Sequence, residues 1–265
     1  MISPSSRTAV LSRQDRIVIL ASVVLLTALA WTYLFHLDHE MSSAMEYDRM
    51  MAGMGMTMDL PWKAADVWFT FGMWTVMMAG MMLPAVAPMM LLVAGTNRGR
   101  EKHRTPHVVV PFSAGYLLVW TAFSAGAAVA QWALHQAALL SPAMTTSGAR
   151  LSGALLMAAG VYQLTPLKSA CLTHCRSPLG FLLSHWQDGA VGGLRMGVSH
   201  GIYCLGCCWA LMCVLFVVGV MNLVWVALLT IVVIVEKVGP AGAFIARVAG
   251  AALITAGALI ATAHL

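Results

Sequence analysis

Residues 199–213 carry metal-binding side chains in an otherwise apolar stretch. They read SHGIYCLGCCWALMC and hold one histidine and four cysteines. In a helix, His200, Cys204 and Cys208 recur every four residues on one face, and Cys207 lies beside this stripe, three residues from Cys204. A single buried cysteine usually acts as a small hydrophobic residue. Thiols and an imidazole sharing one stripe instead predict a site for a soft metal ion.

Methionines are concentrated in two earlier segments. Seven of the eighteen residues 41–58 are methionine, and residues 73–90 hold seven more. Thioether sulfur is a soft ligand that suits Cu(I). In residues 41–58 the alternative is that the methionines anchor the chain at a lipid surface, and in residues 73–90 it is that they pack the core. The candidate ligands in the second segment are Met77, Met78, Met81 and Met82.

A third cluster reads SACLTHC and contains Cys171, His174 and Cys175. The two cysteines are four residues apart, so a helix would place both thiols on one face. Two thiols and an imidazole at this spacing favour metal binding, although less specifically than a doubled CxxC pair. The alternative is a pair of reduced cytosolic cysteines with no role.

The composition decides which elements can position these residues. Of the 265 residues, 60% are hydrophobic and 9% are charged, whereas a soluble protein has roughly a quarter charged residues. The chain is therefore predicted to be an all-α polytopic membrane bundle forming one transmembrane domain, residues 1–265, with about seven transmembrane helices. The apolar runs are residues 17–35, 67–95, 108–138, 151–166, 196–219, 223–235 and 241–263. The fourth and sixth are shorter than the roughly 20 residues that a spanning helix needs.

The basic residues predict the orientation. With a cytoplasmic N-terminus, eleven of the fifteen Lys and Arg fall on cytoplasmic segments, which favours this orientation for a multi-pass membrane protein. Residues 36–66 then form a Met-rich outer loop and residues 167–195 a cytoplasmic loop. Residues 28–30, Ala-Leu-Ala, also fit a signal-peptide cleavage site, so cleavage near residue 30 stays open. The methionines at 77–82 and the cysteines at 204–208 come to similar depths, but the sequence does not show whether their helices are neighbours.

Three motifs resemble those of a known family, in its order: WTVMMAGMMLPAVAPMM, PLKSACLTHC and SHGIYCLGCCW. The family comprises bacterial integral membrane proteins described as predicted metal-binding proteins of undefined function, so the resemblance implies a location in a bacterial inner membrane. The resemblance runs from about residue 74 to about residue 259. It implies that these residues occupy family motif positions: Met77, Met78, Met81, Met82, Pro84, Lys168, Cys171, Cys175, His200, Tyr203, Cys204, Cys207 and Cys208.

These observations predict a membrane protein that binds a soft metal, most simply Cu(I), and stores, delivers or transports it. Its expected partners are the bilayer, the metal ion and another membrane or periplasmic metal-handling protein, with no nucleic acid. Mercury is an alternative ion. No nucleotide-binding motif accompanies the helices, and the sequence does not identify a catalytic step. The alternatives are a thiol–disulfide oxidoreductase that uses the CxxC at 204–207, and an accessory subunit that packs through Gly242, Ala246 and Gly250.

Overall fold

The computed structural model describes residues 11–53, 62–100, 105–137, 139 and 148–262, and every regular element in these ranges is a helix. The all-α prediction is therefore confirmed. The helices are α1 (Arg13–Gly53), α2 (Ala64–Arg100), α3 (Thr105–Gln136), α4 (Ala149–Gln163), α5 (Pro166–Arg176), α6 (Pro178–His185), α7 (Gly189–Cys213), α8 (Leu215–Val218), α9 (Leu223–Val238) and α10 (Gly242–Thr262).

Five helical spans in the described ranges are long and apolar enough to cross a membrane, as judged by length and composition. They are Arg13–Ser43, Ala64–Thr96, Pro106–Gln136, Gly189–Val218 and Gly242–Thr262. The fourth and sixth apolar runs form α4 and α9, which have only 15 and 16 residues. The membrane character of the chain is consistent with these spans, whereas the count of seven spanning helices stays a prediction.

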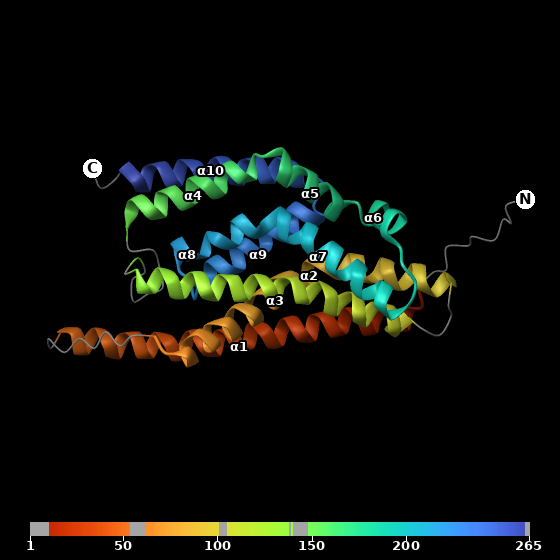
Figure 1. Ribbon diagram of the computed structural model, residues 1–265, viewed down its shortest axis with the longest axis horizontal. Coiled ribbons are helices and arrows are strands. Elements are labelled where there is room, and N and C mark those ends of the chain that lie inside the picture. The colour runs from red at the N-terminus through yellow and green to blue at the C-terminus, as the bar shows by residue number, and fades with distance from the viewer. Residues whose placement is uncertain (1–10, 54–61, 101–104, 138, 140–147, 263–265) are drawn as a thin grey trace, which may run out of the picture.

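Most of the helices run along one common axis (Figure 1). α4 and α10 lie side by side along one edge, α1 runs along the opposite edge, and α2, α3, α7 and α9 lie between them (Figure 1). α1 begins at the end of the molecule opposite to the end where α10 stops (Figure 1). The chain therefore enters this bundle at one end and leaves it at the other.

The first part of the predicted outer loop is helical. α1 continues past the apolar run to Gly53, through a segment rich in the good helix formers Met, Ala and Glu. Residues 54–61, which include Met54, Met56 and Met58, lie outside the described residues. Residues 36–53 thus extend the helix beyond its apolar part rather than forming a turn.

Glycines allow α7 to lie directly against the backbone of α3. A Cβ atom at Gly193 would come within 2.5 Å of the Val108 carbonyl oxygen, and one at Gly197 would overlap the Phe112 carbonyl oxygen. Gly193 and Gly197 share a face of α7 because they are four residues apart. This approach holds Tyr116, four residues beyond Phe112, against the cysteine-bearing part of α7.

A second glycine contact joins α4 to α10. A Cβ atom at Gly160 would lie 2.7 Å from the Gly250 carbonyl oxygen, and one at Gly153 would lie 2.6 Å from that of Gly257. Gly242, Ala246 and Gly250, which the sequence suggested as a surface for another subunit, are buried within this chain. The small residues of α10 are thus used for internal packing with close backbone approach.

We predict that Gly160→Ala lowers the free energy of unfolding, because the added methyl group meets the backbone of α10. Overpacking of this kind typically costs about 1–3 kcal/mol. Gly72→Ala in α2 is the matched control, since a Cβ atom there has nothing within 4 Å. Alanine in an open helical position should be neutral or stabilising by about 0.5–1 kcal/mol. Equal thermal stability of the two variants in detergent would contradict the packing described here.

Candidate metal centre

The buried sulfur of Cys204 lies where three other helices reach α7. Lys237 of α9 donates from Nζ to Cys204 Sγ at 2.8 Å, and the Tyr116 hydroxyl of α3 lies 3.0 Å from the same sulfur. Lys237 Nζ also lies 3.9 Å from Met82 Sδ of α2. Within the described ranges, no carboxylate lies within ion-pair distance of Lys237. A buried ammonium group is stabilised by an anionic partner, so this geometry favours a thiolate at Cys204.

Cys207 and Cys208 stand beside Cys204 on α7. Both thiols donate to the Cys204 carbonyl oxygen, at 3.1 Å and 2.9 Å respectively. Cys207 Sγ also lies 3.9 Å from Cys175 Sγ of α5. The structure therefore brings together cysteines that the sequence placed in two separate clusters.

Local features of α5 position its cysteines. The Thr165 hydroxyl caps the helix by accepting from the Lys168 backbone N–H at 3.3 Å, and a proline opens its first turn. Cys171 packs onto α7 at Gly206, where a Cβ atom would lie 2.8 Å from the Cys171 sulfur. Both Cys171 and Cys175 therefore face α7.

α5 is outside the five long apolar spans, and its thiols hold their protons tightly. Hydrogen bonds with the sulfur atoms of Cys204 and Cys207 raise the pKa of Cys175 well above its ordinary value. Burial and the neighbouring Cys207 raise the pKa of Cys171. A metal ion that binds either sulfur must displace a proton, because the thiolate is the ligand.

His174 does not join Cys171 and Cys175, although all three lie on α5. Its side chain is exposed, and its ring stacks on Tyr203 with the ring centroids 4.4 Å apart. Its Nδ1 lies 2.9 Å from the Ala170 carbonyl oxygen of its own helix. His174 thus lies on the exposed side of the α5–α7 contact.

His200 is buried one turn before Cys204 on α7, at 5% exposure. Its ring lies among aromatic side chains, with centroid distances of 6.0 Å to Phe112 and to Tyr116 and 5.2 Å to Phe181. Its Nδ1 is one of three buried side-chain polar atoms in the described residues that have no hydrogen-bond partner. His200 therefore has a free ring nitrogen close to the cysteines without a hydrogen bond to them.

The candidate methionines of α2 are all buried in the core: Met77, Met78, Met81 and Met82 are each at most 1% exposed. Of these sulfur atoms, that of Met82 contacts the cluster, through Lys237. The sequence left open whether the helices of Met82 and Cys204 are neighbours, and in the structure these two residues are linked through Lys237 and Tyr116. Across the described part of the chain, no group of three or more His, Cys, Asp or Glu side chains is arranged as a ready-made metal site.

Lys237 was not among the predicted site residues, and the sequence analysis included it only as one of the basic residues on cytoplasmic segments. Beside it, Glu236 forms a buried ion pair with Lys168 at 2.7 Å and accepts from Gln163 Nε2 at 3.0 Å. Lys168, which the family resemblance had marked, also donates to the Gln163 side-chain oxygen. The sequence does contain a feature that could have indicated these residues, which is the adjacent pair Glu236 and Lys237 at the end of an apolar run. Charged residues inside a membrane are costly without partners, so such a pair predicts buried polar contacts.

In the comparison with protein-family models, the model PpoB2, described as a copper chaperone, matches residues 71–260. No curated protein and no solved structure matches the chain. The matched range contains the cysteines of α5 and α7, the methionines of α2, Tyr116 and Lys237. It confirms the copper-related character that the sequence predicted, whereas membership of the predicted metal-binding membrane family stays a prediction. Because the match extends over more than half of its length, the chain belongs to the PpoB2 copper chaperone family.

Proposed function

We propose that this protein is a copper chaperone embedded in a bacterial inner membrane, with a cytoplasmic N-terminus, and that it carries Cu(I) on the sulfur atoms around Cys204. The observation that supports this most is the approach of Cys175 to Cys207 beside the Lys237–Cys204 contact. Thiolate and thioether ligands select Cu(I) over harder ions. The family match supports copper as the cargo.

Lys237 would stabilise the Cys204 sulfur as a thiolate before a metal cation binds. Its ammonium group carries one positive charge opposite Cys204 Sγ, and Cu(I) carries the same charge. When copper takes the place of the ammonium group, the net charge beside the sulfur does not change. This matters because an uncompensated charge in a low-dielectric interior is expensive. Cys207 and Cys175 would complete the sulfur ligands, with Met82 and His200 as further donors.

The surroundings suggest an exit for the ion. Cys171 and Cys175 are partly exposed on α5, and His174 beside them is exposed. These residues lie between the buried cysteines of α7 and the surface, so α5 would pass copper to a partner protein. The methionines of residues 41–58 follow the apolar run of α1 in the sequence, and they would collect copper on the outer side. Ligand exchange along this series would require no catalytic step.

A second candidate function is thiol–disulfide exchange. The observation that favours it is the 3.9 Å separation of the Cys175 and Cys207 sulfurs. The Cys204–Cys207 pair suggested by the CxxC pattern is less suitable, because the Cys207 thiol is directed to the Cys204 carbonyl oxygen. Cys207 is 1% exposed, so an attacking protein thiol has no direct access. Copper binding is therefore favoured.

We expect purified, reduced protein offered both metals to bind Cu(I) in preference to Zn(II). The buried cluster is built of soft sulfur donors and contains no carboxylate, and methionine is a poor ligand for zinc. Metal analysis of the protein in detergent after desalting gives the ratio directly. Stoichiometric zinc without copper would contradict the proposed function.

Cys204→Ser, Cys207→Ser and Cys175→Ser should each weaken Cu(I) binding by about tenfold or more, which corresponds to 1.4 kcal/mol or more. Serine keeps the size of the side chain but removes the soft ligand. Cys213→Ser is the control, because Cys213 lies at the end of α7 and makes no contact with the cluster. Competition against a chromophoric Cu(I) chelator measures the affinities. Equal losses of Cu(I) affinity in Cys213→Ser and Cys204→Ser would contradict the assignment of the metal site to this face of α7.

Replacing the seven methionines of residues 41–58 by leucine should slow copper loading without changing the final occupancy. Leucine keeps the apolar volume and the helical preference of methionine but removes the sulfur. The measurement is the time course of Cu(I) uptake by protein reconstituted into vesicles, at limiting copper. Identical time courses for the wild type and the variant would assign these methionines to the lipid surface instead.

A further inference from the structure

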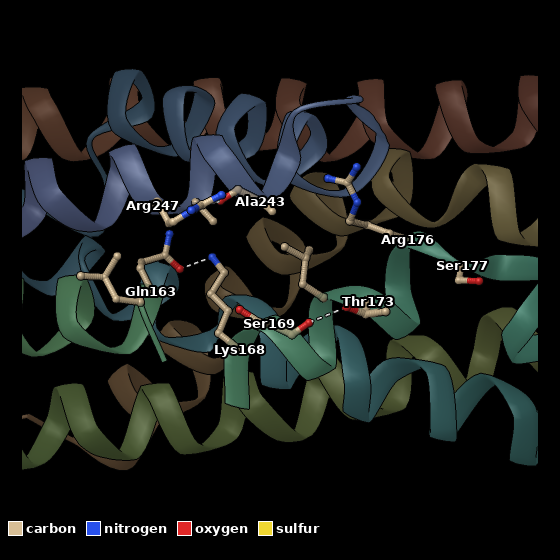
Figure 2. Close-up of a pocket in the computed structure, with 11 residues that line it drawn as sticks. Gln163, Lys168, Ser169, Thr173, Arg176, Ser177, Ala243 and Arg247 are labelled. Carbon is tan, nitrogen blue, oxygen red and sulfur yellow. Dashed lines mark hydrogen bonds between the residues drawn. The ribbon is translucent and has the colours of Figure 1, made fainter. Parts of the chain in front are cut away.

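A cavity of about 450 Å³ lies between α4, α5 and α10, and none of its lining residues is a cysteine or a methionine (Figure 2). Three of the lining side chains are cationic: Lys168, Arg176 and Arg247. No carboxylate lines it. The cavity is thus chemically different from the sulfur cluster around Cys204.

The two arginines keep their charge uncompensated. Lys168 is neutralised by Glu236, which lies 2.7 Å away. Arg176 instead donates to two backbone carbonyl oxygens, those of Glu236 at 2.9 Å and Pro240 at 3.2 Å. Arg247 donates from Nε to the Ala243 carbonyl oxygen of its own helix at 3.3 Å. In the described residues, neither guanidinium group has a carboxylate within ion-pair distance, so the cavity is suited to an anion.

The depth of the cavity in the bundle suggests the kind of anion. α9 ends at Val238 and α10 begins at Gly242, so the turn between them marks one end of both helices. Arg247 lies five residues into α10, about 7.5 Å along its axis. An unpaired charge at this depth of an apolar helix is costly unless it meets a polar partner. With the chain inserted as proposed above, this level is the boundary between lipid headgroups and acyl chains.

The remaining walls fit an amphiphile. Leu164, Leu172 and Ala246 supply an apolar surface beside the arginines. The planar guanidinium fork matches the oxygens of a phosphate group. A phosphate with an attached acyl chain would therefore satisfy both parts of the wall, whereas a free phosphate would satisfy only the arginines.

We propose that this cavity binds an anionic phospholipid, whose phosphate diester is held by Arg176 and Arg247 and whose acyl chain lies over Leu164 and Leu172. This site goes beyond copper handling and depends only on the proposed insertion into a membrane. Basic pockets between helices at a membrane surface are a recognised way of holding acidic headgroups.

The test uses the full-length protein extracted from membranes in detergent. Native mass spectrometry compares the binding of phosphatidylglycerol with that of phosphatidylcholine, and thermal unfolding is followed with each lipid and with inorganic phosphate alone. Arg247→Gln is the main variant, because this side chain is exposed and bonds only to its own helix. Arg195→Gln is the matched control, since it removes an exposed charge on α7 outside the cavity.

Phosphatidylglycerol should bind and stabilise the wild type and Arg195→Gln, and its affinity should fall about tenfold in Arg247→Gln. Arg176→Lys, which keeps the charge but loses the fork, should also bind less lipid. Equal lipid binding by Arg247→Gln, equal binding of phosphatidylcholine, or equal stabilisation by inorganic phosphate would overturn the proposal. The Cu(I) content of the same samples is measured separately. Loss of lipid binding can therefore be distinguished from loss of copper binding.

Discussion

A buried ammonium group in contact with a buried sulfur constrains how five of the helices meet. Lys237 lies 2.8 Å from Cys204, and at 9% exposure it has little access to solvent. Its neighbour Glu236 forms a buried ion pair with Lys168 of α5. Two adjacent residues at the end of one helix therefore connect α9 to α7 and α2 through the lysine, and to α4 and α5 through the glutamate. Charges in a low-dielectric interior strongly penalise any displacement that would separate them.

The glycines of α7 make this arrangement sterically feasible. Their contact with the α3 backbone brings Tyr116 to within 3.0 Å of the Cys204 sulfur. On α5, the approach of Cys171 depends on the missing side chain of Gly206. Close backbone packing thus creates the space in which thiols from α5 and α7 come within 3.9 Å. The same packing keeps water away from the sulfurs, which favours a soft ion over a hydrated one.

Much of the fold could be predicted from the sequence, because apolar runs separated by charged or turn residues mark helices directly. The Gly219–Asn222 turn between α8 and α9, for example, has Gly219 at φ 99 and Asn222 capping α9. The proximity of the Cys175 and Cys207 sulfurs could not be predicted, because it depends on how α5 packs against α7. Lys237 could not be identified as a partner for sulfur, because a basic residue at the end of an apolar run is explained equally well by the topology of the chain. The helical spacing predicted that Cys204, Cys207 and Cys208 lie close together on α7, but spacing alone could not show that the Cys207 and Cys208 thiols donate to the Cys204 carbonyl oxygen.

The central claim is that copper is held by sulfur atoms contributed by α5 and α7. X-ray absorption spectroscopy of the Cu(I)-loaded protein at the copper edge reports the donor atoms directly. The account predicts a first coordination shell dominated by sulfur in the wild type, with fewer sulfur donors in Cys175→Ser, and an unchanged spectrum in Cys213→Ser. A shell of nitrogen or oxygen atoms without sulfur, or a sulfur shell unaffected by Cys175→Ser, would contradict it.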